Sequence, residues 1–406
     1  MSDLSRPRFL DSGSPPHIFT LTALAGVSAL TMNIHLPSLP GMSEYFGVNY
    51  RVMQLSVALF LAGNALLQLV IGPLSDRFGR RPVLLTSLSI FLLATLGCIF
   101  APTAQLFLVF RMVQSVVAAG MVLSRAVVRD MVPGDEAASM IAYVTMGMSL
   151  IPMLAPALGG FLDAAFGWHA NFWFLFGLGG ALFWLIWRDL GETSTPQEGG
   201  FRAQLAEYPA LLSSPRFWGY AAAAMFASGA FFAYLGGAPF VGSEIYHLDP
   251  ASLGLLFGAA AFGYLFGNGV SGRYAVRFGI DRMILAGTLV STSSMFLSLL
   301  AHLAGFAHPA VFFGFMVPLG FGNGLVLPNA TAGTLSVRPR LAGSASGLGG
   351  ALMIAGGATL SAYAGTLLSV ESGAVPLIAL MLASSLLSVV AILLVMRRAR
   401  RVGPTG

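Results

Sequence analysis

Long apolar runs alternate with short polar stretches along the whole chain. An α-helix needs about 20 mostly apolar residues to cross a hydrocarbon core of about 30 Å. Twelve runs reach that length, at residues 17–38, 50–71, 82–101, 105–129, 137–162, 169–188, 217–240, 251–272, 282–303, 309–333, 342–368 and 374–396. This pattern predicts an all-α polytopic membrane protein with twelve transmembrane helices.

The arginines are distributed unevenly between these runs. All 21 basic residues are arginine; the odd-numbered connections hold Arg51 and almost no others, whereas the even-numbered connections and the chain ends are rich in them. Positively charged loops stay in the cytoplasm, so both termini and all even-numbered connections are expected there. Charged residues make up only 9% of the chain, against about 25% in a soluble domain. The arginines therefore indicate topology in a lipid bilayer and not binding to nucleic acid.

The longest polar stretch separates the sixth run from the seventh. It predicts a cytoplasmic linker at 189–216 between an N-terminal bundle (1–188) and a C-terminal bundle with a basic tail (217–406). The two halves share a spaced pattern, Gly63…Gly72…Arg77-Phe78-Gly79 and Gly263…Gly272…Arg277-Phe278-Gly279. Such a repeat predicts two pseudo-symmetric six-helix bundles with a substrate site where they meet near the bilayer midplane.

A short, densely charged stretch at 72–82 follows the second run. Its charges must lie at a water interface, since burying an unpaired charge is costly. The stretch is expected to be a loop, in which glycines allow a tight reversal and Pro82 suits the first turn of the next helix. The residues of interest here are Gly72, Asp76, Arg77, Gly79 and Arg80.

Two polar side chains lie inside the fourth run. Arg111 is surrounded by apolar residues, and Gln114 is three residues further on the same helix face. An arginine inside a membrane is expected to face a cavity or a polar partner. The alternative is that Arg111 snorkels to the nearer membrane surface.

The fifth run contains paired prolines and paired glycines. Pro152 and Pro156 remove backbone donors and bend the helix, whereas Gly159 and Gly160 allow a neighbouring helix to approach closely. These residues predict a kinked helix that packs closely against a neighbour.

These motifs resemble those of the major facilitator superfamily, and in particular the Bcr/CflA branch of 12-helix drug:proton antiporters. The family patterns are G-x-L-a-D-r-x-G-r-[rk] after helix 2, R-x-x-Q-G in helix 4 and g-x-x-x-G-P-x-x-G-G in helix 5. This chain has Ser115 and Ala155 at two of the glycine positions. The resemblance implies that Asp76 latches onto the start of helix 11, at 341–344, and that Arg80 or Arg77 pairs with Asp130. It also implies that the bend in helix 5 seals the cytoplasmic side against leak, with a generic kinked helix as the alternative.

The end of the first run departs from the branch. Where the family typically has D-M-Y-L-P, this chain has Asn33-Ile34-His35-Leu36-Pro37, and an amide carries no proton. None of the 16 acidic residues lies in the middle of a run, and Asp163 at the end of the fifth run is the nearest. His35 is then the candidate for proton binding, since imidazole titrates near neutrality. The alternative is an interfacial histidine that is hydrogen-bonded to backbone.

The second half offers candidate cavity walls. Phe231 and Tyr234 in the seventh run place aromatic surface beside paired glycines, and Asn323 in the tenth run is a candidate polar contact. Such a surface suits neutral or weakly cationic compounds. Plain packing is the alternative for each of these residues.

The chain shows no catalytic pattern. Cys98 is the single cysteine, the histidines lack metal-ligand spacing, and a chain without lysine has no phosphate-binding G-x-x-x-x-G-K-[ST] loop. Met1 to Pro16 is polar and lacks the form of a signal peptide. We therefore expect no enzyme, no cofactor and no metal, but a monomer in a bacterial inner membrane.

The resemblance implies a secondary active transporter that exports small, largely apolar antimicrobials by alternating access, in exchange for protons. A second hypothesis is a facilitator or exporter of a specific metabolite or organic anion, with Arg111 as counter-charge and weak or no proton coupling. A third is a non-transporting sensor or assembly factor.

Overall fold

The computed structural model describes residues 9–131, 151–193, 209, 211–337 and 342–402, which form helices joined by short loops and contain no strand. The N-terminal bundle comprises α1 (Ile18–Asn33), η1 (Leu36–Ser38), α2 (Leu39–Tyr45), α3 (Tyr50–Phe78), α4 (Arg80–Ile99), α5 (Ala104–Gln114), η2 (Ser115–Ala118), α6 (Ala119–Met131), α8 (Ile151–Phe166) and α9 (His169–Asp189). The C-terminal bundle comprises α11 (Pro215–Phe240), η3 (Val241–Ile245), α12 (Pro250–Phe257), α13 (Ala259–Phe278), α14 (Ile280–Leu303), α15 (Pro309–Val337), α16 (Ala342–Leu367) and α17 (Val375–Val402).

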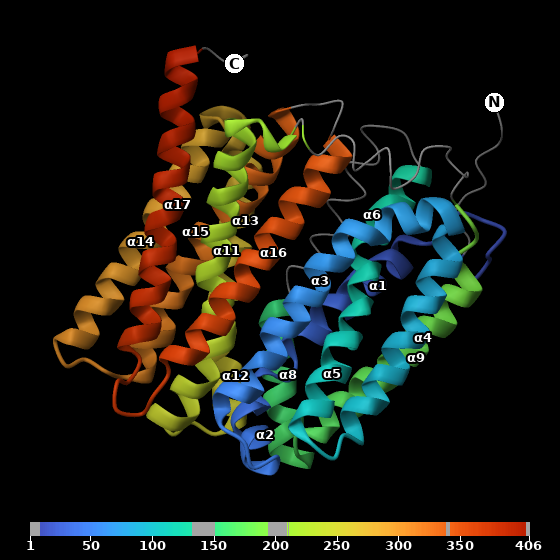
Figure 1. Cartoon of the computed structure of the whole chain (residues 1–406), viewed down its shortest axis with the longest axis horizontal. Helices are drawn as coiled ribbons and strands as arrows, with labels where there is room; N and C mark the ends of the chain where they lie inside the picture. Colours follow the sequence, from blue (N-terminus) through green and yellow to red (C-terminus); the bar gives the residue numbers. More distant parts are fainter. Residues whose placement is uncertain (1–8, 132–150, 194–208, 210, 338–341, 403–406) are drawn as a thin grey trace.

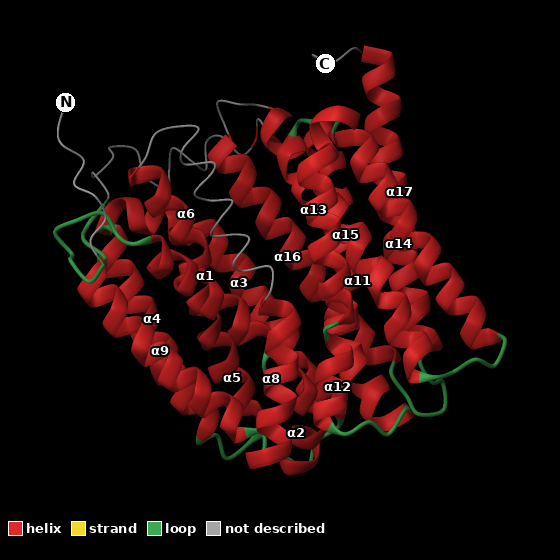
Figure 2. Cartoon of the chain, turned by 180° about the vertical axis from the view of Figure 1, so that it is seen from behind, coloured by secondary structure: helices red, strands yellow, loops and turns green. Residues whose placement is uncertain are grey.

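The two bundles lie side by side, and their long helices run from one face of the molecule to the opposite face (Figures 1 and 2). We name the face at which α17 ends the proximal face and the opposite one, where α2 lies, the distal face. In the described residues, eleven helices are long and apolar enough to cross a membrane, and Leu154–Phe166 is a shorter apolar helix. That helix belongs to the fifth expected span, whose first part lies outside the described residues. The expected twelve-helix architecture is confirmed.

The charged stretch at 72–82 is mostly helical, so the expected loop is wrong in extent. Helix α3 continues through Gly72 to Phe78, and only Gly79 interrupts it, with φ 92° and ψ 151°. Gly279 adopts the same conformation in the second half, with φ 81° and ψ 153°. Glycine is needed at both reversals because other residues are strained there. The matching turns support the internal repeat.

A close approach of α8 to α12 joins the bundles near the distal face. A Cβ added to Gly160 would lie 2.1 Å from the Pro250 carbonyl oxygen, and one added to Gly254 would lie 2.4 Å from that of Pro156. The two glycines are therefore positions where the backbones of α8 and α12 touch.

Asp249 begins α12 as its N-cap, accepting at Oδ1 from the backbone N–H groups of Ala251 and Ser252. Hydrogen bonds from Ser252 in particular lower the pKa of this carboxyl below its usual value.

The first turns of α3 add polar contacts between the bundles near the same face. We call these contacts, together with the glycine contacts of α8 and α12, the distal seal. The Tyr50 hydroxyl donates to the Gly236 carbonyl at 2.8 Å, and Arg51 Nη2 donates to the Leu368 carbonyl at 3.4 Å. The buried Gln54 amide donates to the Ser361 carbonyl on α16. All three bonds connect α3 to the C-terminal bundle through backbone acceptors. The seal therefore depends on backbone positions in α11, α16 and the loop that follows α16.

We predict that Gly160→Ala loosens this seal, because the new Cβ forces the Pro250 backbone away at a cost of about 1–3 kcal/mol. In a Cys98→Ala background, a cysteine introduced at the buried Ala364 of α16 should react several-fold faster with a membrane-impermeant maleimide. Gly177→Ala is the matched control, since nothing lies within 4 Å of its added Cβ. Equal labelling in both variants would contradict the role of the glycine contact.

Candidate functional site

The first membrane helix breaks where its polar residues lie. Pro37 has no N–H to donate to the Asn33 carbonyl, and its ring clashes with that carbonyl in a continuous helix. Accordingly α1 ends at Asn33, His35 lies in a turn, and the chain resumes as η1. The proline thereby turns the imidazole toward α5 while the segment remains inside the bundle.

Arg111 on α5 is the centre of a buried polar cluster in the N-terminal bundle. Its guanidinium donates to the Thr31 carbonyl at 2.8 Å and to His35 Nδ1 at 3.2 Å through Nη2, and to Gln114 Oε1 through Nη1. The guanidinium carbon lies 4.3 Å from the centre of the Phe60 ring. Among the described residues no carboxylate pairs with this cation. Its charge is instead compensated by three acceptors and one aromatic face.

The hydrogen bond between Arg111 and His35 fixes the state of the imidazole. A guanidinium has donors only, so His35 Nδ1 must be the acceptor and must carry no proton. The remaining Nε2 lies 3.4 Å from the Ser56 hydroxyl. Both residues are fully buried. In this structure His35 is therefore the neutral Nε2–H tautomer, and the expectation of an interfacial histidine bonded to backbone is wrong.

The structure decides between the alternatives for Arg111. The side chain has no exposed surface, so it neither snorkels to the membrane surface nor faces open space in this conformation. It faces polar partners, as an intramembrane arginine is expected to do. Gln114 is part of the cluster as the spacing predicts, and its Nε2 donates to the Thr95 hydroxyl at 2.8 Å.

The fourth span is also interrupted, directly after this cluster. Helix α5 passes into the short 3-10 segment η2 at Ser115, whose hydroxyl donates back to the Met112 carbonyl at 2.7 Å. A Cβ on Gly63 of α3 would lie 2.2 Å from that hydroxyl oxygen. The serine that replaces the family's glycine is therefore accommodated by a glycine on the neighbouring helix.

The two candidate asparagines are buried and incompletely hydrogen-bonded. Asn33 Nδ2 donates to the Ala29 carbonyl at 2.7 Å, but its Oδ1 has no partner. Asn323 Oδ1, on α15, has none either. No hydrogen bond among the described residues joins Asn33 to Arg111. Each of these two oxygens is an acceptor that a donor group on a bound molecule would satisfy.

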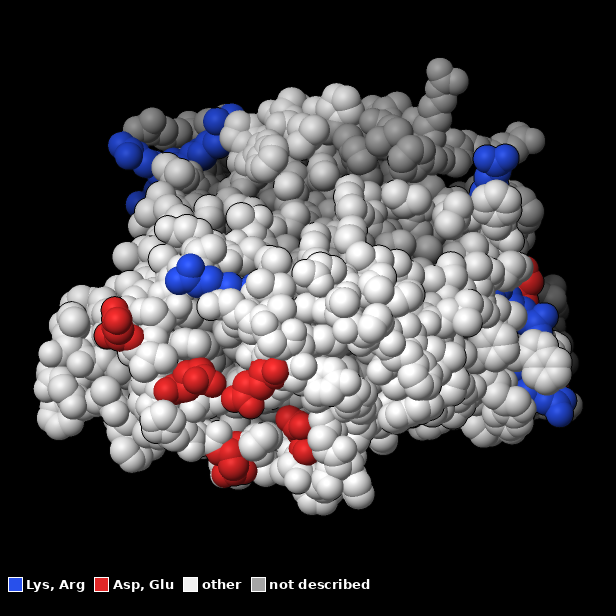
Figure 3. Space-filling view, turned by 60° about the horizontal axis from the view of Figure 1, so that its bottom comes forward, with Lys and Arg blue, Asp and Glu red and all other residues white. Residues whose placement is uncertain are grey.

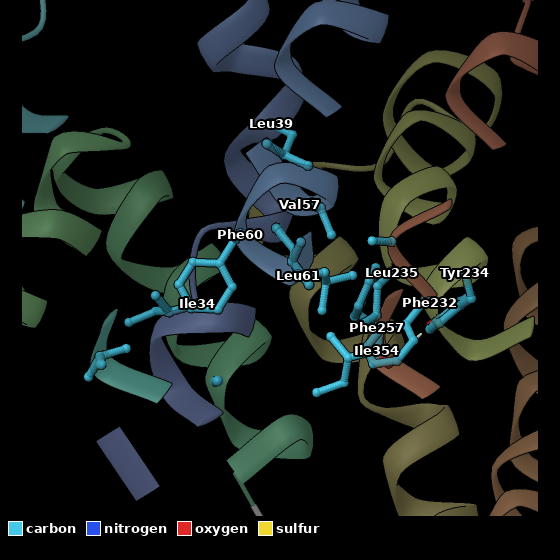
Figure 4. Packing of buried hydrophobic residues seen from close by; sticks show 14 of the residues in the cluster. Ile34, Leu39, Val57, Phe60, Leu61, Phe232, Tyr234, Leu235, Phe257 and Ile354 are labelled. Carbon is cyan, nitrogen blue, oxygen red and sulfur yellow. Dashed lines mark hydrogen bonds between the residues drawn. The ribbon is translucent and has the colours of Figure 1, made fainter. Parts of the chain in front are cut away.

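The aromatic residues of α11 are mainly packing residues. Tyr234 is fully buried, stacks on Phe257 with ring centres 4.7 Å apart and donates its hydroxyl to the Phe257 carbonyl at 3.0 Å (Figure 4). Phe231 is partly buried beside it. The expected cavity wall is therefore wrong for Tyr234, since its surface and its hydroxyl are already taken within the C-terminal bundle.

At the proximal face, the charged stretch forms a network inside the N-terminal bundle. Arg80 pairs with Asp76 at 2.5 Å and with Asp130 at 3.0 Å, so the expected Arg80–Asp130 contact is present. Glu192 accepts from the backbone N–H groups of Arg80 and Arg81 at 2.8 and 3.2 Å, which caps the start of α4. Sequence reasoning missed Glu192, because it comes from the segment after α9.

Other expected gating residues take separate positions. Arg77 is exposed and lies over the Phe78 ring. Pro156 lies inside α8, and an added Cβ on Gly159 would lie 1.7 Å from the Ile34 carbonyl oxygen, next to His35. Residue 341 and the side chains of Pro152 and of 342–344, the expected latch partners, lie outside the part that the structure describes. Asp163 on α8 is half-buried.

The architecture defines a polytopic membrane protein of the transporter type, and the comparisons with known proteins agree. The model of the Major Facilitator Superfamily matches residues 21–362 and also 242–405. The chain belongs to this superfamily.

Three relatives cover most of the chain. It is 30% identical over 383 residues to the MFS-type transporter YdgK of Bacillus subtilis (91% of this chain, 92% of that protein). It is 27% identical to multidrug resistance protein D of Escherichia coli (89% and 91%). It is 28% identical to a bicyclomycin resistance protein homologue of Haemophilus influenzae (84% and 87%). The names of the last two relatives confirm the resemblance to the drug-resistance branch.

A solved structure has the same fold. The bacterial homologue of the human lysosomal transporter Spinster, in an inward-facing and occupied conformation, matches with a TM-score of 0.71 at 15% identity and covers 94% of this chain and 96% of that one. The likeness confirms the all-helical major facilitator fold.

Proposed function

We propose that this protein exports small, largely apolar antimicrobials by alternating access, in exchange for protons. The observation that supports the proposal most is the buried Arg111–His35 hydrogen bond, because it joins a fixed cation to a titratable group inside a bundle. We further propose a monomer in a bacterial inner membrane, organised as bundles 1–188 and 217–406 with a linker at 189–216. The proximal face, which carries Arg77, Arg80 and Arg81, is then cytoplasmic.

Proton coupling in this proposal works through mutual exclusion. A protonated His35 has a donor at Nδ1 and can no longer accept from Arg111, and two cations then lie side by side without a carboxylate. Proton binding therefore releases the guanidinium from His35. Because His35 is next to the Ile34 backbone that contacts Gly159 on α8, the change reaches the helix of the distal seal.

We predict that His35→Gln uncouples transport from protons, since the amide oxygen still accepts from Arg111 but does not titrate. In proteoliposomes, wild type should accumulate chloramphenicol several-fold when a pH gradient is imposed, whereas the variant should only equilibrate it. His302→Gln is the control, because His302 is also buried but bonds to Tyr246 and Ser298 in the C-terminal bundle. Gradient-driven accumulation by His35→Gln would contradict this coupling.

The proximal network is proposed to bias the two conformations. The side chain of Asp76 is 39% exposed, so its pair with Arg80 contributes at most about 1 kcal/mol to folding. In the proposal its larger role is a contact with the start of α16 in the other conformation.

We therefore predict that Asp76→Asn lowers chloramphenicol export in a pump-deficient bacterium by at least about fivefold, the effect of roughly 1 kcal/mol or more. The amount of membrane-inserted protein and its melting temperature should hardly change. Glu371→Gln, at an exposed acidic residue of the loop before α17, serves as the control. Full export by Asp76→Asn would refute the latch.

One observation favours the second candidate function, transport of an organic anion with weak or no proton coupling. Arg111 has no carboxylate partner among the described residues, so an anion that displaced its neutral acceptors would pair with a cation that no carboxylate of this chain neutralises. Flux in the proteoliposome assay that ignores the pH gradient in wild type would support this candidate over exchange with protons.

A further inference from the structure

A cavity of about 400 Å³ lies between the two bundles at the distal face. One wall comes from α2 and the first turn of α3, with Glu44, Tyr50 and Arg51, and the other from the end of α11 and η3, with Phe240 and Glu244. The loop after α16 completes the lining. Sites for small organic molecules have volumes in this range. Since the walls belong to different bundles, the cavity has this form only while the distal seal is closed.

Breaks in two helices place carboxylates at this junction. Pro239 has no N–H, and α11 passes directly after it into η3, a π-helical segment that carries Glu244. On the other wall, Glu44 is in the short helix α2, and Asn49 caps α3 by accepting from the Arg51 N–H at 2.9 Å. The two glutamates thereby line one cavity from opposite bundles.

The arginine of the cavity does not neutralise these carboxylates. Arg51 Nη2 donates to the Leu368 carbonyl at 3.4 Å, and no ion pair in the described part of the chain joins Arg51 to either glutamate. Glu244 Oε1 accepts from the Ser243 hydroxyl at 3.4 Å, which is a neutral donor. The lining therefore carries two carboxylates against one guanidinium, and its net charge is negative.

The rest of the distal face has the same sign of charge. Among the described residues, Asp163, Asp249 and Glu371 also lie towards this face, and Arg51 is the single arginine at its helix ends and loops. Figure 3, in which the distal side comes forward, shows acidic side chains gathered there. A surface of one sign raises the local concentration of ions of the opposite sign. A cation that arrives from the distal side is therefore favoured over an anion.

Two aromatic rings provide an apolar surface beside the carboxylates. The Tyr50 and Phe240 rings come from opposite bundles, and their centres lie 5.1 Å apart at an interplanar angle of 51°. The Tyr50 hydroxyl already donates to the Gly236 carbonyl, so this residue offers the cavity ring surface and not a free donor. Aromatic rings attract cations, and their apolar surface suits the body of an organic molecule. The lining as a whole fits a small aromatic ammonium compound.

We propose that this cavity binds small organic cations with an aromatic body from the distal side, and that the bound cation holds the distal seal closed. Because the ligand contacts both bundles, it stabilises only the conformation in which they meet at this face. It therefore inhibits export without occupying the Arg111–His35 cluster. This consequence for transport rests on the proposed export by alternating access, whereas binding to the cavity does not.

Three compounds with one indole ring test the site. They are tryptamine, which is a cation at neutral pH, tryptophol, which is neutral, and indole-3-acetate, which is an anion. Equilibrium binding to the purified full-length protein is measured at constant low salt for wild type, Glu44→Gln, Glu244→Gln and the double variant. Glu371→Gln is the matched control, because Glu371 is an exposed glutamate of the same face that does not line the cavity.

Wild type is expected to bind tryptamine at least about tenfold more tightly than tryptophol, and indole-3-acetate most weakly. Each single substitution in the cavity should lower the ratio of tryptamine to tryptophol affinity by about threefold, and the double variant by about tenfold. Glu371→Gln should keep this ratio within about twofold. A ratio that the double variant leaves unchanged, or tighter binding of indole-3-acetate than of tryptamine by wild type, would overturn the proposal.

Cysteine labelling tests whether the bound cation holds the seal closed. The reporter is Ala364→Cys in the Cys98→Ala background, since Ala364 is buried and does not line the cavity. Tryptamine at about ten times its dissociation constant should slow reaction with a membrane-impermeant maleimide by about tenfold. The same concentration should hardly affect the reporter that also carries Glu44→Gln and Glu244→Gln. An unchanged or faster reaction with tryptamine bound, or uptake of tryptamine as a transported substrate by proteoliposomes, would contradict the closing role.

Chloramphenicol flux in proteoliposomes separates this inference from the proposed function. If tryptamine binds through the two glutamates and slows labelling, but wild type does not transport chloramphenicol, the export function fails and the site stands. If wild type transports chloramphenicol while tryptamine neither binds nor slows labelling, export stands and the site fails.

Discussion

A guanidinium buried in an apolar bundle without a carboxylate is the constraint on which the N-terminal half depends. Moving an ion out of water costs several kcal/mol even after relaxation. Arg111 recovers this through hydrogen bonds to a charged group, each contributing about 1.5–3 kcal/mol, and a desolvated cation–π contact of about 2 kcal/mol. The compensation requires Thr31, His35, Gln114 and Phe60 to remain in place together. The first, second and fourth spans are thereby held around one charge.

The breaks in the helices follow from the same requirement. Pro37 ends α1 so that a backbone carbonyl and an imidazole from one span both reach Arg111. Ser115 tightens the fourth span directly after Gln114, and Gly63 makes room for it. On the other side of α1, Gly159 allows α8 to lie against the Ile34 backbone. A change in the charge of His35 would therefore act on the contact between Ile34 and Gly159, where the backbones of α1 and α8 touch without intervening side chains.

Much of the fold could be predicted from the sequence, because apolar length and arginine distribution are local signals. The Arg80–Asp130 pair was also within reach, since the family motif places both residues at the same end of the bundle. The helical structure of 72–78 could not be predicted, because a helix that projects into water carries charges as readily as a loop does. The Glu192 cap was hidden by a separation of 112 residues.

The site was predicted in its parts but not in its connection. His35 and Arg111 were each identified as candidates, but their hydrogen bond joins residues that are 76 apart in the sequence. It could not be predicted, because a histidine and an arginine can both be cations, and two cations are not expected to form a contact. Pro37 is the signal that indicates the break before it. For Tyr234, aromatic composition could not distinguish a cavity wall from packing, since the same ring serves both; its bond to the Phe257 carbonyl decides the matter.

The most direct test of this account is the tautomer of His35, measured by nitrogen NMR on protein with labelled histidine, with the resonance assigned by its loss in a variant at this position. At neutral pH and without substrate, the account predicts a neutral imidazole with its proton on Nε2 and an unprotonated Nδ1. An imidazolium, or a neutral ring with its proton on Nδ1, would contradict the hydrogen bond from Arg111 and with it the proposed coupling.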